Sequence, residues 1–244
     1  MDAKKTDIIA RLQQDILSMQ GFKTGQAGSA VDVGLGSIHH AFPNASFPTG
    51  AVHEFLAAGA EDTAATSGFI AGVLSALMHN SGASVWISSS RMIFPPALKL
   101  FGIEPDRVIF IDLQKEKDVL WAMEEALKCD GLAAVVGEMQ DIGFTASRRL
   151  QLAVEQSRVT GFLLRNNPRS LNTLACVSRW KIKPLPSELE DNMPGVGFPR
   201  WNVDLLKIRN GRPGSWQVEW VAGRFRHVSQ KIALLPQEQK LKAV

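Results

Sequence analysis

The sequence predicts an α/β protein with a mixed, mainly parallel sheet flanked by helices and with antiparallel strands at its C-terminal end. Short runs rich in Val and Ile alternate with helical segments between residues 51 and 165, which is typical of parallel sheets covered by helices. From residue 174 onward, apolar and polar residues alternate one by one, as in antiparallel strands with one solvated face. A chain of 244 residues with 45% hydrophobic residues fits one substantial domain with short tails.

The first 44 residues are predicted to form a helix and a linker. Apolar residues recur at helical spacing over residues 6–20, and they form a candidate partner-binding stripe: Ile8, Ile9, Leu12 and Ile16. The stripe either folds back on the core or docks on another protein, and both interpretations stay open. Residues 21–48 are rich in Gly, Ser, Ala and Pro, which indicates a linker or a loop strapped across the next domain. We place the domain boundary after residue 44.

Residues 45–228 are predicted to form the core domain. After a turn at Pro48–Gly50, a compact strand is expected at 51–57, and an Ala-rich helix follows from about 62 to 80. The remaining parallel strands are expected at 84–89, 108–112, 132–137 and 160–165, with helices at 93–101, 115–129 and 145–158. Because helices separate these strands, consecutive strands should run parallel.

The C-terminal part of the core is predicted to be antiparallel. Strands are expected at 174–183, 201–209 and 215–221, with four tryptophans on their buried faces: Trp180, Trp201, Trp216 and Trp220. A turn at 210–214 joins the last two strands, and a Pro-rich, acidic loop spans 184–199. Residues 229–244 are polar and are expected to form a flexible tail.

Charge is divided unevenly along the chain. Residues 1–140 hold 10 Lys and Arg against 16 Asp and Glu, whereas residues 141–244 hold 17 against 8. This division indicates either a basic surface for DNA or an acidic partner, or two solvated faces of different charge. No apolar stretch is long enough to cross a bilayer, and residues 1–20 lack a cleavage-site pattern, so we expect a cytoplasmic protein. Cys129 and Cys176 lie far apart and are both expected to be buried.

The loop after the first strand stands where a phosphate-binding loop would occur. Laid on the motif GxxxxGK[ST] from Gly59, the second glycine becomes Ala64, the lysine becomes Ala65, and only Thr66 is retained. No lysine occurs between Lys23 and Lys99, so no shift of register supplies the missing cation. We therefore expect no nucleotide cofactor, and we expect Asp62 or Thr63 to cap the following helix.

Other positions where hydrolysis needs carboxylates agree with this expectation. Gly137 stands where a magnesium-binding aspartate normally ends the fourth strand, and Glu138, displaced by one residue, should point to the opposite face. Residues 88–90, after the second strand, are three serines. His39 and His40 are adjacent in a loop, and His53 has no second histidine at metal-ligand spacing, so no metal site is predicted.

The order of these segments resembles RecA, and several runs resemble the ImuA family. The runs are WAMEEAL at 121–127, LAAVVGE at 132–138, TASRRLQLA at 145–153, PRW at 199–201, and GRPG at 211–214 followed by Trp216. The likeness covers residues 45–221. It implies a RecA-like core and a non-catalytic, SOS-regulated accessory protein of translesion DNA synthesis. The partners that it implies are an ImuB-like inactive polymerase homologue and an error-prone DNA polymerase, with RecA as a further candidate.

The sequence departs from RecA in the loops that bind single-stranded DNA. Only the short segments 139–144 and 166–172 stand in their place, which weakens the expectation of DNA binding. Four arginines beside these segments form the candidate DNA-binding set: Arg148, Arg149, Arg165 and Arg169. Two alternatives stay open. The first is a division inhibitor like SulA, which is also a degenerate relative of RecA, and the second is an atypical RecA-like ATPase that binds DNA.

Overall fold

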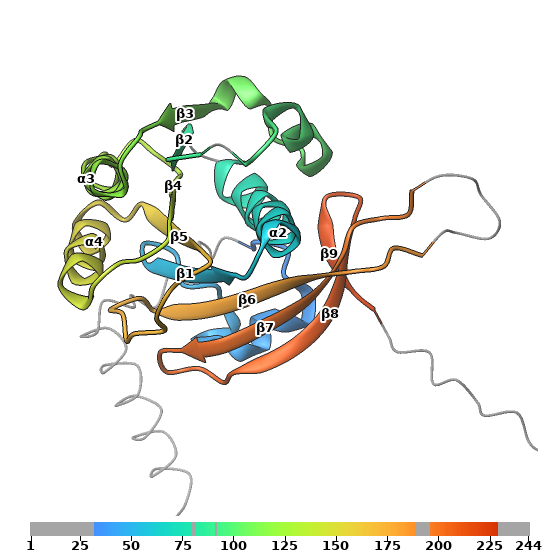
Figure 1. The fold of residues 1–244 in the computed structure, drawn as a ribbon. Coiled ribbons are helices and arrows are strands. Elements are labelled where there is room, and N and C mark those ends of the chain that lie inside the picture. Colours follow the sequence, from blue (N-terminus) through green and yellow to red (C-terminus); the bar gives the residue numbers. More distant parts are fainter. Residues whose placement is uncertain (1–31, 80–81, 91, 189–195, 229–244) are drawn as a thin grey trace, which may run out of the picture.

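The computed structural model describes residues 32–79, 82–90, 92–188 and 196–228. The predicted helix at 6–20, with its partner-binding stripe, and the predicted tail at 229–244 lie outside these residues. In the described part, one sheet has the strand order β3-β2-β4-β5-β1-β6-β7-β8-β9 (Figure 1). Its strands are β1 (Val52–Ala57), β2 (Ser84–Ser88), β3 (Val108–Asp112), β4 (Ala134–Met139), β5 (Thr160–Asn166), β6 (Ser178–Leu185), β7 (Arg200–Ile208), β8 (Gly214–Val221) and β9 (Arg224–His227).

The sheet is parallel from β3 to β6 and antiparallel from β6 to β9. The inner parallel strands β1, β2, β4 and β5 are short and almost wholly buried, as expected where helices cover both faces, whereas the edge strand β3 is partly exposed. The antiparallel strands β6 and β7 alternate buried and more exposed residues over most of their length, because one face is wet. This arrangement confirms the predicted fold class.

Three long helices cover the two faces of the sheet (Figure 1). α2 (Ala60–Met78) lies on one face, and α3 (Glu116–Leu127) and α4 (Phe144–Ser157) lie on the other. α3 buries Val119, Met123 and Leu127, which recur every four residues and so form one stripe against the sheet. No helix in the described part of the chain is long and apolar enough to span a membrane.

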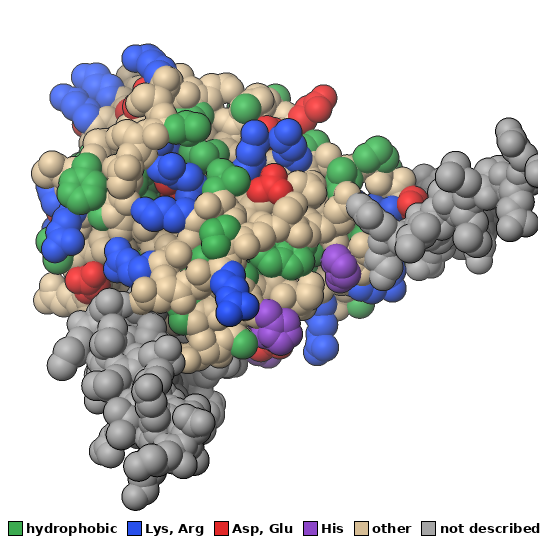
Figure 2. All heavy atoms as spheres, turned by 90° about the horizontal axis from the view of Figure 1, so that it is seen from below, with side chains coloured by type: hydrophobic (Ala, Val, Ile, Leu, Met, Phe, Trp, Pro, Cys, Tyr) green, Lys and Arg blue, Asp and Glu red, His purple; other side chains and the backbone are tan. Residues whose placement is uncertain are grey.

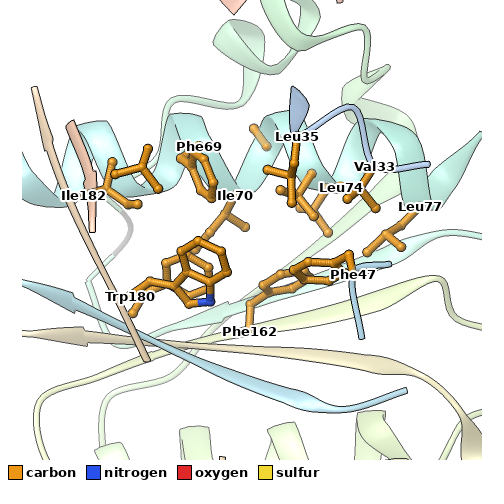
Figure 3. Packing of buried hydrophobic residues seen from close by; sticks show 14 of the residues in the cluster. Val33, Leu35, Phe47, Phe69, Ile70, Leu74, Leu77, Phe162, Trp180 and Ile182 are labelled. Carbon is orange, nitrogen blue, oxygen red and sulfur yellow. The ribbon is translucent and has the colours of Figure 1, made fainter. Parts of the chain in front are cut away.

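The larger hydrophobic cluster fills the space between α2 and the sheet. Phe69, Ile70 and Leu74 of α2 point toward the sheet, where Trp180 and Phe162 meet them (Figure 3). The ring of Trp180 also stacks on that of Phe55, with 5.9 Å between centroids. The cluster anchors β1, which leads directly into the loop where a nucleotide would bind.

Residues 32–50, here called the strap, cross the same face of the sheet beside α2. The strap buries six of its apolar side chains in the larger cluster: Val33, Leu35, Ile38, Ala41, Phe42 and Phe47. The Phe225 amide of β9 donates to Gly34 O (3.1 Å), and the Arg212 amide donates to Ala41 O (2.8 Å). Of the two interpretations of residues 21–48, the described residues match the strap, and the packing is continuous across the predicted boundary at residue 44.

Several elements differ from those expected. Residues 93–101 contain a 3-10 helix at Pro95–Phe101 where an α-helix was expected, since two prolines at its start supply no amide donors. The strand expected at 174–183 begins at Ser178, and β9 was not predicted. Trp180, Trp201 and Trp220 are buried as expected, whereas Trp216 is half-buried. The expectation for the cysteines was right for Cys176 and wrong for Cys129, which is exposed.

Candidate functional site

The connection between β1 and α2 is too short to cradle a phosphate. Only Ala58 and Gly59 separate the end of β1 from the first turn of α2. Gly59 has φ 119° and ψ 172°, a conformation that residues with a side chain rarely adopt, which lets the chain turn into the helix at once. The residues aligned with the end of the phosphate-binding motif, Ala64 to Thr66, therefore lie inside the helix and form no loop.

The short connection is also closed by its own polar groups. Asp62 Oδ2 accepts a hydrogen bond from the Ala58 amide (3.3 Å), so a carboxylate faces the backbone where an anion would have to sit. The Thr63 hydroxyl lies within hydrogen-bond distance of Gly59 O (2.9 Å) and Asn166 Oδ1 (3.0 Å). The expected cap was wrong in its position: Gly59 is the N-cap and makes no side-chain bond, because α2 begins two residues earlier than predicted. Asp62 still complements the helix dipole from the first turn.

Thr66 and Ala65 lie on the buried side of α2. Both are less than one-tenth exposed, and the Thr66 hydroxyl has no hydrogen-bond partner among the described residues. A side chain in this position faces the sheet and not a ligand in solvent. Thr66, which matches the last position of the motif, is therefore part of the packing.

Glu138 is the buried carboxylate nearest in sequence to the expected magnesium ligand. It lies on β4, and its neighbours two and four residues back, Val136 and Ala134, belong to the cluster under α2. The expectation that Glu138 points away from the nucleotide face was wrong. Gly137 occupies the α3 face instead, where an added Cβ would lie 2.5 Å from Met123 Sδ. The prediction assumed that residue 137 faces the nucleotide side of the sheet, whereas Gly137 packs against α3 on the other side.

The Glu138 carboxyl group is buried beside the Trp86 indole. Burial raises its pKa to about 7, although hydrogen bonds from Trp86 and Asn166 partly oppose this. Trp86 Nε1 donates to Glu138 Oε1 at 2.5 Å. The second oxygen, Glu138 Oε2, is buried without a hydrogen-bond partner among the described residues, so the indole satisfies only one of the two oxygens. No group of three or more metal-binding side chains occurs in the described ranges.

The four candidate DNA-binding arginines do not form one surface. Arg165 is completely buried and pairs with Glu54 Oε1 (2.9 Å) and Asp141 Oδ1 (3.2 Å), so its inclusion in the set was wrong. Arg169 is exposed and lies 3.7 Å from the same Asp141. On α4, Arg149 pairs with Glu124 of α3 (2.5 Å), and Arg148 is exposed.

Sequence reasoning missed the ion network that surrounds Arg165. Glu54 lies on β1 between two arginines, accepting hydrogen bonds from Arg165 and from Arg179 Nε (2.6 Å). Asn172 Oδ1 and Ser170 O accept further bonds from Arg165. These contacts fix the segment after β5 against the strand ends. The signal was present in the sequence, because one acid in the apolar run 51–57 and one base in 160–165 require buried partners.

Comparison with known proteins identifies relatives by sequence and a similar fold by structure. No family model matches the chain. The chain is 36% identical over 211 residues to Protein ImuA of Caulobacter vibrioides strain NA1000 / CB15N, an alignment that covers 80% of this chain and 86% of that protein. Protein ImuA of C. vibrioides strain ATCC 19089 / CIP 103742 / CB 15 matches equally. Among solved structures, the RadB recombinase aligns with a TM-score of 0.56 and 12% identity, covering 82% of this chain and 100% of that one. This likeness shows the RecA-like fold.

Proposed function

Because the chain belongs to the ImuA family, we propose that it is a RecA-like accessory protein of damage-induced mutagenesis that acts through protein contacts and catalyses no reaction. The observation that carries the non-catalytic part is the two-residue connection between β1 and α2. Phosphoryl transfer needs a loop around the phosphates, a cation and a metal-bound carboxylate. In the described structure the connection is closed by Asp62, the sequence has no lysine between Lys23 and Lys99, and the carboxylate of Glu138 is buried.

The partners that we propose are an ImuB-like inactive polymerase homologue and an error-prone DNA polymerase, with RecA as a further candidate. Support for protein contacts comes from large apolar side chains that the described structure leaves exposed. On the α3–α4 side these are Trp121 (64% exposed), Phe144 (54%) and Leu152 (51%). Exposed aromatic residues of this kind are enriched at protein interfaces.

Calorimetric titration of the full chain with ATP and magnesium tests the non-catalytic part. We expect no heat of binding up to millimolar nucleotide. Micromolar binding, or hydrolysis above the buffer rate, would overturn this part and favour the alternative of an atypical RecA-like ATPase. Because Ala65 is buried in α2, restoring a lysine there would test folding and not nucleotide binding, so the natural chain is the right protein for the titration.

Affinity capture by an ImuB-like partner tests the protein contacts. We expect Trp121→Ala and Phe144→Ala to weaken capture of the full chain at least tenfold, since aromatic anchors dominate interface energies. Leu206→Ala on β7 is the matched control, because Leu206 is also exposed (46%) but lies on a different surface. Equal capture of all the variants would place the interface elsewhere and contradict this surface.

A further inference from the structure

The antiparallel end of the sheet has one face that no long helix of the described structure covers. α3 packs on β2 and β4, and α4 packs on β1 and β5, whereas β6, β7 and β8 lie beyond them. On β6, Trp180 and Ile182 point into the cluster under α2, so Lys181 and Lys183 point the other way. We call this surface the outer face. It carries the outward residues of three strands: Arg179, Lys181, Lys183, Arg200, Asn202, Asp204, Lys207, Ser215, Gln217 and Glu219.

Basic side chains outnumber acidic ones on the outer face, five to two, and one of the two acids, Asp204, is the register partner of Lys181. Asp204 accepts hydrogen bonds from Asn202 (2.9 Å) and Ser215 (2.6 Å). Glu219 pairs with two arginines of its own face, Arg200 (3.1 Å) and Arg226 (2.5 Å).

Three lysines of the outer face lie outside these ion pairs. Lys181, Lys183 and Lys207 make no ion pair within 4 Å in the part of the chain that is described, and Lys183 and Lys207 are exposed. Lys181 and Lys183 are two residues apart on one strand, about 7 Å along it. Lys207 extends this row across to β7, where its register partner is Arg179. Seen from below, the molecule shows Lys and Arg side chains spread over its surface with fewer acids among them (Figure 2).

The lysine row adjoins a polar hollow. Lys183 faces Asn202 on β7, and Asn202 faces Gln217 on β8, so the three residues form a line across adjacent strands. A hollow of about 320 Å³ begins at the end of this line, lined by Asn202, Ser215, Trp216, Gln217, His227 and Val228. Its volume is at the lower end of the ~300–1,000 Å³ of pockets that hold small organic ligands. Side-chain amides both donate and accept hydrogen bonds, which is the pattern that base edges present.

We propose that the outer face binds single-stranded nucleic acid, with Lys181, Lys183 and Lys207 on the phosphates and one unpaired base in the hollow beside Gln217. Lysines in a row that form no ion pair match a chain of phosphates, and an adjoining pocket with amides matches a base that is free of a complementary strand. A base paired in a duplex keeps its edge inside the helix and cannot enter the hollow. This site is distinct from the arginines predicted from sequence, and it stands independently of the proposed protein contacts.

The test is fluorescence anisotropy of the full chain with a labelled 20-nucleotide oligothymidylate over a series of salt concentrations. We expect the triple variant Lys181→Gln, Lys183→Gln, Lys207→Gln to bind at least ~10-fold more weakly at 0.1 M salt and to lower the slope of log affinity against log salt by about 2, from ~0.7 per phosphate contact. A matched control with the same change of charge is the triple variant Lys99→Gln, Lys115→Gln, Lys117→Gln, which alters three exposed lysines outside the outer face. Thermal unfolding of both variants verifies that they are folded.

A second measurement isolates the hollow. The natural chain should bind oligothymidylate more tightly than an abasic strand of equal length, and Gln217→Ala should remove this difference while leaving the salt slope unchanged. Three results would overturn the proposal: no binding at low salt, an equal loss in the control variant, or equal affinity for a duplex. Displacement of the oligonucleotide by polyglutamate at equal charge would also overturn it, in favour of an acidic protein segment.

Discussion

Replacing Glu138 by glutamine should remove a pH dependence from the stability of the fold. The change is nearly isosteric and keeps an oxygen to accept the hydrogen bond from Trp86. Glu138 has an ordinary pKa of 4.5 in the unfolded chain and a pKa of about 7 in the fold, where burial disfavours its charge. Between these values the folded chain keeps a proton that the unfolded chain has released.

The sign and size of the effect follow from this difference. The stabilisation by Glu138 is fully present below pH 4.5 and is lost as the pH rises through about 7, because the folded state then has to ionise a buried acid. At 1.36 kcal/mol per unit of pKa, the free energy of unfolding should fall by about 2.5 kcal/mol between pH 5 and pH 8 through this group alone. Glu138→Gln cannot titrate and should show none of this fall.

Urea unfolding of both proteins at pH 5, 6, 7 and 8, followed by circular dichroism, measures the effect. The quantity to compare is the difference in unfolding free energy between the natural chain and Glu138→Gln, because other titrating groups cancel in it. His53 is one such group: burial lowers its pKa to about 4, so it stabilises the fold above pH 6.5 and loses this contribution as the pH falls toward 4. A difference that does not change with pH would refute the assignment of a raised pKa to Glu138.

Three further predictions concern the core. Arg165→Leu should destabilise the chain by about 3–5 kcal/mol in urea unfolding, because it removes the fully buried one of the two arginines that pair with the Glu54 carboxylate, and a loss under 1 kcal/mol would contradict this. Gly137→Ala should cost about 1–3 kcal/mol and lower the melting temperature, since its Cβ would meet a methionine sulphur of α3 at 2.5 Å, and an unchanged melting temperature would show that α3 moves freely. In thiol titration, Cys129 should react at once and Cys176, whose pKa burial raises to about 12, only on unfolding; two fast thiols would refute the packing around Cys176.

Local patterns predicted the order of strands and helices, because the parallel strands are short, mainly apolar runs that alternate with helical segments. The pattern failed for β9, where the run RFRH carries one apolar residue and takes its pairing from β8 and the strap. The apolar run around Arg165 signals a buried base, but its pairing with Glu54 and Asp141 could not be predicted, because these residues lie far apart in sequence. The absent lysine predicted that no phosphate binds after β1, whereas the two-residue length of the connection between β1 and α2 appears only in the structure. The resemblance to the ImuA family is confirmed by the relatives in C. vibrioides.

The strap has a consequence for biosynthesis. Gly34 near the start of the described residues pairs with Phe225 in β9, so this contact cannot form until β9 has left the ribosome. Until then, the apolar side of α2 that the strap and β9 cover has no partner of its own. Translation that stops before β9 should therefore leave a nascent chain that depends on chaperones, whereas release of the C-terminal strands completes the domain in one step.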